Sequence, residues 1–194
     1  MIILGITGPT GAGKSTVSKI FKKYGVEIID TDILARKIVE PKKPALKELA
    51  DAFGKNILND DSTLKRSELA RLAFSDPARL KILNSITHRY IKEEINILIG
   101  KSKSDTVGID GAVLFESGVS DMCDYIISVT ADEDIRIKRI MARDSISEDA
   151  ARTRIGAQKN NAFYLENSDY IVYNNGREDL EEQVKNILNN VKGA

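Results

Sequence analysis

The N-terminal stretch Met1-Ile-Ile-Leu-Gly-Ile-Thr-Gly-Pro-Thr-Gly-Ala-Gly-Lys-Ser15 decides the fold class. Its first seven residues form a short apolar run that is typical of a buried parallel strand. The rest matches the pattern G-x-x-x-x-G-K-[ST] at Gly8, Gly13, Lys14 and Ser15. In this pattern backbone N–H groups surround a nucleotide phosphate, the lysine reaches the β- and γ-phosphates, and the hydroxyl is a Mg²⁺ ligand. The stretch therefore predicts a phosphate-binding loop between a strand and a helix.

Strand-like and helix-like segments alternate along the rest of the chain. We expect a helix at 15–24 and strands at 26–29, 105–114, 125–130 and 170–173, with later helices at 131–143, 147–158 and 178–191. This alternation predicts an α/β fold of the P-loop NTPase type, with three α/β/α layers and a five-stranded parallel sheet. The helix-rich stretch 33–100 reads as an insertion into one domain of 194 residues, whose core is about 1–32 and 105–194.

The composition limits the classes of partner. Lys plus Arg and Asp plus Glu both number 29, so net charge gives no electrostatic argument for a nucleic-acid or membrane partner. The single cysteine, Cys123, can form no intrachain disulfide, and no apolar run approaches the roughly 20 residues of a membrane span. We expect a cytoplasmic protein that is a monomer or a weak homo-oligomer, with a packed, inert thiol at Cys123.

A switch GTPase is excluded by its missing signatures. The guanine-reading N-K-x-D is absent, and Lys159-Asn160 has the reverse order. Asp105-Thr-Val-Gly108 matches D-x-x-G by letter, but it precedes or begins a predicted strand instead of following one. A small-molecule kinase is the interpretation that remains.

Two further segments could take part in catalysis: the acidic pair Asp30 and Asp32, and the basic face of the predicted helix 131–143. Asp32 follows the second strand and could take the proton from an acceptor hydroxyl, or it could only cap a helix starting at Ile33. Both interpretations stay open on spacing alone.

Three arginines, Arg136, Arg139 and Arg143, share one face of a predicted helix and could neutralise charge on a transferring phosphoryl group. The alternative is a solvated face, with Arg136 paired to Asp132. The only histidine, His88, has no second His or Cys nearby, so it predicts no zinc site.

Together these segments resemble the dephospho-coenzyme A kinase family over nearly the whole chain. The matching stretches are Leu4–Gly8 with Gly11–Ser15, Ile29–Arg36 with Val39–Pro41, Leu83–His88, Leu114–Glu116, Arg139–Asp144, Arg154–Gln158 and Asp169–Gly176. The D-x-D-x-x-A-R segment is what narrows the resemblance beyond the phosphate loop. The chain departs from the family pattern at Gly8-Pro9-Thr10, at Ala112-Val113-Leu114 and at Arg89, where the family usually has proline.

The resemblance implies transfer of the γ-phosphoryl of ATP, with Mg²⁺, to the 3′-hydroxyl of dephospho-CoA. It also implies roles for particular residues. The expected catalytic residues are Asp32, Lys14, Arg139 and Arg143, and the metal ligand is Ser15. The nucleotide is expected at Gly11, Ala12, Gly13, Lys14, Ser15, Thr16, Asn174 and Asn175, and the acceptor at Thr10, Asp32, Arg36 and His88. The insertion would bind the acceptor, and residues 139–158 would form a lid.

Two other functions fit the same residues. A nucleoside monophosphate kinase needs arginines for a 5′-phosphate, and the insertion offers Arg66, Arg71 and Arg79. A nucleotide-binding regulatory protein would need only the loop, although Asp32 beside it favours an enzyme.

Overall fold

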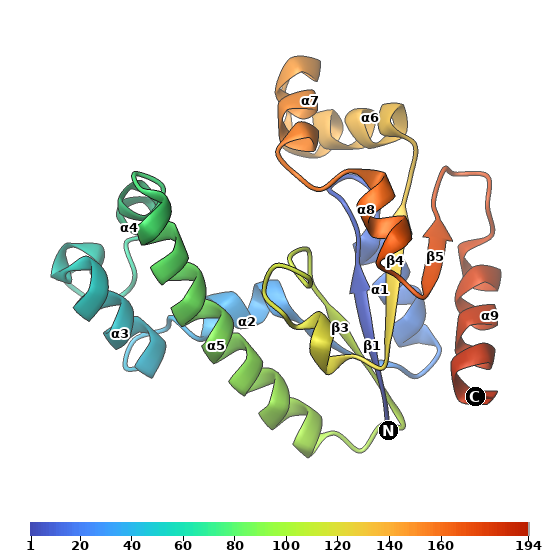
Figure 1. Cartoon of the computed structure of the whole chain (residues 1–194), viewed down its shortest axis with the longest axis horizontal. Helices are drawn as coiled ribbons and strands as arrows, with labels where there is room; N and C mark the ends of the chain where they lie inside the picture. The colour runs from blue at the N-terminus through green and yellow to red at the C-terminus, as the bar shows by residue number, and fades with distance from the viewer. Residues whose placement is uncertain (194) are drawn as a thin grey trace. The chain divides into compact units, whose positions relative to one another are not determined.

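The computed structural model describes residues 1–193 and divides the chain into two compact units. The first unit contains residues 1–29 and the chain from Ser102 onward, and the second contains Asp30–Lys101. Figure 1 traces both units in chain order.

The first unit is built on a five-stranded parallel sheet with the strand order β2-β3-β1-β4-β5. The strands are β1 (Ile2–Thr7), β2 (Glu27–Asp30), β3 (Thr106–Asp110), β4 (Tyr125–Thr130) and β5 (Tyr170–Tyr173). The central strand β1 pairs with β3 from Ile2 opposite Thr106, and with β4 from Leu4 opposite Tyr125. This confirms the predicted α/β class and its parallel sheet.

Helices of the first unit cover the sheet and extend past one of its ends. They are α1 (Lys14–Lys23), α6 (Glu133–Asp144), α7 (Glu148–Gly156), α8 (Asn161–Glu166) and α9 (Leu180–Gly193), with a 3₁₀ turn η2 at Ser120–Met122. α1 and α9 contact each other, and their buried apolar side chains join those of β1, β4 and β5 in one core. α6 and α7 pack together at the end towards which β1, β4 and β5 point (Figure 1).

The burial pattern explains why these segments fold as they do. Leu4, Ile6, Ile127 and Val129 are fully buried because parallel strands are covered on both faces. Phe21 on α1 is fully buried against the same core. Removing such a side chain from water contributes roughly 1.5–3 kcal/mol, so the sheet and α1 stabilise each other.

The second unit is helical. It contains α2 (Thr31–Lys37), α3 (Pro44–Phe53), the 3₁₀ turn η1 (Lys55–Ile57), α4 (Arg66–Ala73) and the long α5 (Pro77–Lys101). α5 contacts α2, α3 and α4. It begins at Pro77, and the Asp76 carboxylate just before it accepts from the Ala78 N–H at 2.9 Å. Among residues 1–193, no helix combines the length and apolar character needed to cross a membrane.

Some predicted boundaries are wrong. The expected strand 105–114 ends at Asp110, and a tight turn follows it, in which the Ser117 N–H donates to the Val113 carbonyl. The short helix α8 was not predicted; Asn160 caps it by accepting from the Phe163 N–H at 2.9 Å. Apolar runs continue past the end of a strand, so hydrophobicity alone does not locate such an end.

Candidate active site

The phosphate loop, residues 8–15, joins β1 to α1 through three glycines with positive φ. The φ angles are 147° at Gly8, 79° at Gly11 and 92° at Gly13. A Cβ at Gly8 would lie 2.2 Å from the Val129 carbonyl oxygen, so a side chain there would require the backbone to move. Gly13 is also the N-cap of α1. Because glycine has no side chain, no cap side chain accepts from the first-turn N–H groups of this helix. This geometry leaves the start of α1 suited to an anion.

The remaining loop residues differ in what they can offer a ligand. The Ser15 and Thr16 side chains are exposed at the start of α1, whereas Ala12 is fully buried. The Ala12 N–H donates to the Pro9 carbonyl at 3.2 Å, a bond that closes the loop on itself. Ala12 therefore shapes the loop.

Lys14 forms an ion pair with Asp110, the last residue of β3. The carboxylate side chain of Asp110 is 7% exposed and the Lys14 side chain 18% exposed. A buried carboxylate beside the loop lysine holds the ammonium group at the carboxyl ends of the strands, where ligands of such sheets bind. Asp110 was not among the residues predicted for the site. The signal that could have found it is a carboxylate at the very end of a buried strand.

Arg139, on α6, and Asn174, directly after β5, both form hydrogen bonds to the phosphate loop. The Arg139 guanidinium on α6 donates to the Gly11 and Ala12 carbonyls, both at 3.3 Å, and to the Asn174 side-chain oxygen at 3.2 Å. The buried Asn174 amide, directly after β5, donates to the Ala12 carbonyl at 2.8 Å. The structure thus brings three predicted site segments together, although Arg139 and Asn174 each lie more than 120 residues after the loop in sequence.

Arg143 and Asn175, which were also predicted for the site, have other hydrogen-bond partners. Arg143 pairs with Asp144 at 2.8 Å and its side chain is 60% exposed. That bond raises the pKa of Arg143 and lowers the pKa of Asp144, which also pairs with Arg154. Asn175 accepts from the Asp132 N–H at 2.8 Å and so joins β5 to the start of α6. Of the two arginines predicted for the lid, only Arg139 contacts the loop in this structure.

Arg136 is buried, so the interpretation as a solvated residue paired with Asp132 is wrong. Its side chain donates to the Thr10 carbonyl at 2.9 Å and to the Asn161 side-chain oxygen at 3.1 Å. Within the described chain its Nη2 has no hydrogen-bond partner, and burial lowers the pKa of Arg136. The sequence did contain a signal: Arg136 lies four residues before Ile140, on the apolar face of α6.

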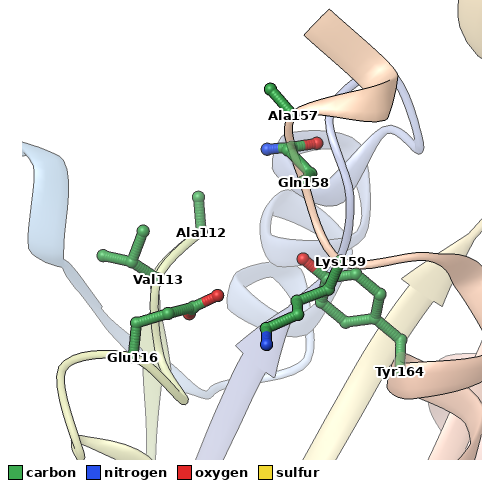
Figure 2. A pocket seen from close by; sticks show the side chains of 7 residues that line it. All are labelled: Ala112, Val113, Glu116, Ala157, Gln158, Lys159 and Tyr164. Atoms are coloured by element: carbon green, nitrogen blue, oxygen red, sulfur yellow. The ribbon is translucent and has the colours of Figure 1, made fainter.

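A cavity of about 370 Å³ lies next to the phosphate loop (Figure 2). Ala112, Val113 and Glu116 line it on one side, and Ala157, Gln158, Lys159 and Tyr164 on the other. The Gln158 side-chain oxygen accepts from the Thr10 N–H at 2.8 Å, which ties this wall to the loop. Figure 2 shows Glu116 and Lys159 extending towards each other across the cavity. Burial, with the Glu116 charge adding to it, raises the pKa of Tyr164.

Predicted site residues of the second unit lie on α2 and α5. Asp30 caps α2 by accepting from the Asp32 and Ile33 N–H groups at 2.8 and 3.1 Å. The alternative in which Asp32 is the cap is therefore wrong. The Asp32 carboxylate is exposed in the first turn of α2, and Arg36 is exposed in the last turn.

His88 is half-buried on α5, and the arginine after it has a structural partner. Arg89 forms an ion pair with Glu48 on α3, and its guanidinium lies 4.7 Å from the centre of the Tyr90 ring. Glu48 also accepts from the Tyr90 hydroxyl at 2.9 Å. The residue that replaces the family's usual proline thus joins α5 to α3.

Comparison with known proteins identifies the family to which this site belongs. The family model for dephospho-CoA kinase matches residues 2–179. A dephospho-CoA kinase of Corynebacterium jeikeium is 42% identical over 188 residues, which cover 95% of this chain and 96% of that protein. One of Carboxydothermus hydrogenoformans is 38% identical over 96% of this chain and 92% of its own length.

Solved structures agree with these relatives. The dephospho-CoA kinase from Campylobacter jejuni is 28% identical, covers 98% of each chain and superposes with a TM-score of 0.70. A shikimate kinase from Bacteroides thetaiotaomicron, at 15% identity and a TM-score of 0.57, shares the fold. With the family match over most of its length and a complete phosphate loop, this chain belongs to the dephospho-CoA kinase family.

Proposed function

We propose that the protein transfers the γ-phosphoryl group of ATP to the 3′-hydroxyl of the ribose in dephospho-CoA, giving CoA and ADP. The observation that carries this proposal is the phosphate loop held by Arg139 and Asn174, in a chain that matches the family model over residues 2–179. The acceptor oxygen forms a bond to the γ-phosphorus while the bond to the β,γ-bridging oxygen breaks. The charge that develops on the transferred group is what the loop and its cations stabilise.

Lys14 and Arg139 are the proposed phosphate-binding cations. The Lys14 ammonium exchanges its Asp110 partner for the β- and γ-phosphate oxygens when the nucleotide binds. Arg139 donates to the Gly11 and Ala12 carbonyls, and this contact with the loop supports its assignment to the γ-phosphate. Arg143 pairs with Asp144 instead, so the same support does not extend to it.

Asp32 is the proposed general base, which accepts the proton of the 3′-hydroxyl. Its carboxylate serves no cap, because Asp30 has that task, and it has no hydrogen bond among residues 1–193. An exposed, uncommitted carboxylate after a parallel strand suits this role. Arg36, His88 and the rest of the 33–100 insertion are proposed to bind the acceptor, and residues 139–158 to close as a lid.

Mg²⁺ fits the donors beside the loop. The Ser15 hydroxyl and the Asp110 carboxylate offer oxygen ligands, which a hard cation prefers, and Mg²⁺ usually takes only one or two carboxylates besides substrate phosphates. When bound with ATP, the ion would neutralise charge on the phosphates.

The test is an acceptor screen on the purified chain. With ATP and Mg²⁺, dephospho-CoA should be converted to CoA, detected by chromatography, while AMP, CMP and UMP should not be phosphorylated. Phosphorylation of a nucleoside monophosphate without formation of CoA would support the alternative kinase. Tight ATP binding without transfer to any acceptor would support a regulatory protein instead.

A further inference from the structure

A second cavity, of about 550 Å³, lies in the helical unit, and its lining contains neither Asp32, Arg36 nor His88, the residues named for the acceptor. It is formed by α3 with the two lysines that precede it, and by the chain around η1. Its apolar lining is Pro44, Leu46, Ala50 and Leu58, and its polar lining is Lys42, Lys43, Lys47, Lys55, Asp51 and Ser62. The volume falls within the 300–1,000 Å³ typical of small-molecule sites, which are also mostly apolar with a few polar groups. We call it the lysine groove.

The lysine groove carries a local excess of positive charge on a chain whose net charge is zero. Four lysines line it, and the one carboxylate, Asp51, pairs with Lys47 at 3.2 Å. Among residues 1–193, no carboxylate lies within ion-pair distance of Lys42, Lys43 or Lys55. Three uncompensated ammonium groups around one cavity repel each other, and an anion bound among them would relieve that repulsion.

The backbone at two positions of this rim is strained. Lys42 has a φ of 70° and Ser62 a φ of 65°, and only one other described residue besides glycine, Ser145, has a positive φ. Residues other than glycine in this region of backbone conformation are strained, and such residues cluster at active sites and ligand-binding segments. The Ser62 turn is fixed by its N–H bond to the Asn59 carbonyl at 2.9 Å. A glycine would fit Lys42 without strain, and the lysine instead supplies a cation to the rim.

The start of α3 adds to the positive electrostatic potential of the lysine groove. Lys43 is the N-cap of α3 and Pro44 its first residue, and no side chain bonds the first-turn N–H groups. The positive end of this helix dipole therefore belongs to the lining that already holds the lysines.

From this combination we propose that the lysine groove binds an amphipathic anion: an organic phosphate, sulfonate or carboxylate that carries a compact apolar body. The anionic group would lie among Lys42, Lys43 and Lys55, and the apolar body would contact Leu46, Ala50 and Leu58. Purely polar anions such as inorganic phosphate would bind weakly, because the apolar lining gives them no contact. The proposal concerns a second site and does not rest on the phosphoryl-transfer assignment.

The test uses 8-anilinonaphthalene-1-sulfonate, a fluorescent aromatic sulfonate, titrated into the full chain with excess ATP to occupy the phosphate loop. The double variant Lys42→Gly/Lys55→Gln removes two cations, and we expect its Kd for the probe to rise about tenfold. The variant should fold, because glycine relaxes the Lys42 backbone, and its Tm should rise by roughly 2–4 °C as that strain is released. The matched control is Lys81→Gln, an exposed lysine on α5 outside the groove, which should leave the Kd unchanged.

Competition separates the possible sources of the ligand. Displacement of the probe by decyl phosphate but not by inorganic phosphate supports the amphipathic class. Displacement of the probe by dephospho-CoA would make the groove part of the acceptor site and would overturn the proposal of a second site, whereas failure of dephospho-CoA to compete would support it. The proposal is overturned if the double variant binds the probe as tightly as the unmodified chain, or if inorganic phosphate competes as well as decyl phosphate.

Discussion

Replacing Arg136 with Met tests whether the buried guanidinium holds the phosphate loop in place. The change keeps much of the side-chain volume and removes the bonds to the Thr10 carbonyl and the Asn161 oxygen. Hydrogen bonds from a charged donor are worth roughly 1.5–3 kcal/mol each, and release of a partly uncompensated buried charge offsets about half of the two-bond loss. We expect the free energy of unfolding to fall by about 2 kcal/mol.

The effect on nucleotide binding follows from Thr10. Without Arg136, the Thr10 backbone keeps one hydrogen bond among residues 1–193, from its N–H to Gln158. The Thr10 backbone then has to be ordered again when phosphate binds. Ordering one residue costs about 1–2 kcal/mol, which corresponds to a roughly 5- to 30-fold rise in KM for ATP. The value of kcat at saturating ATP should change much less, because Arg136 is a positioning residue that does not contact the reacting atoms.

The assays are urea unfolding followed by circular dichroism, and initial rates at varied ATP. Lys138→Met is the matched control, since Lys138 is exposed on the same helix. Arg136→Lys keeps the charge but cannot reproduce both bonds, so partial recovery of KM would assign part of the effect to charge. If Arg136→Met leaves both the KM for ATP and the free energy of unfolding equal to those of Lys138→Met, then Arg136 does not hold the loop.

Three further predictions concern single residues. Asp32→Asn should lower kcat roughly 10²- to 10⁴-fold with little change in ATP affinity, measured by isothermal titration, because it removes the proposed base; an unchanged kcat would leave Asp32 without a catalytic role. Asp110→Asn frees Lys14 from its ion pair, so ATP without Mg²⁺ should bind about tenfold tighter, while Mg²⁺-dependent turnover should fall. Weaker binding of Mg²⁺-free ATP would contradict the competition between Asp110 and phosphate for Lys14. Burial raises the pKa of Cys123 from 9.0 to about 12. At pH 8 the folded thiol should therefore react with iodoacetamide roughly 10³-fold more slowly than the thiol of the chain unfolded in urea, as followed by mass spectrometry. Equal rates would show that folding does not protect the thiol.

Local patterns were enough to predict most of the sheet. The apolar runs at 1–7, 125–130 and 170–173 became β1, β4 and β5, because side chains buried on both faces of a parallel strand leave little room for polar residues. The third strand was predicted to end four residues too late, at residue 114 instead of Asp110. Its apolar run continues through Val113 and Leu114 after the ladder has ended at Asp110, and hydrophobicity does not report where pairing stops.

The phosphate-loop motif of the candidate site was predictable from the sequence. The residues that hold the loop from other elements were much less predictable. Gly8, Gly13, Lys14 and Ser15 follow one another at a fixed spacing, so their neighbourhood is set by the chain itself. Arg136 and Asp110 depend on which distant elements pack beside the loop. Nothing near Arg136 in sequence announces that its guanidinium reaches Thr10, 126 residues away.

By itself, the sequence determined the class of fold, the phosphate loop and the resemblance to one kinase family, because periodicity, glycine spacing and motif letters are local properties of the chain. Only the tertiary structure decided that Arg139 contacts the loop while Arg143 pairs with Asp144, that Asp30 rather than Asp32 caps α2, and that the lysines at 42, 43 and 55 line one groove. Burial and partner choice are set by contacts between segments far apart in sequence, and these exist only after the chain has packed.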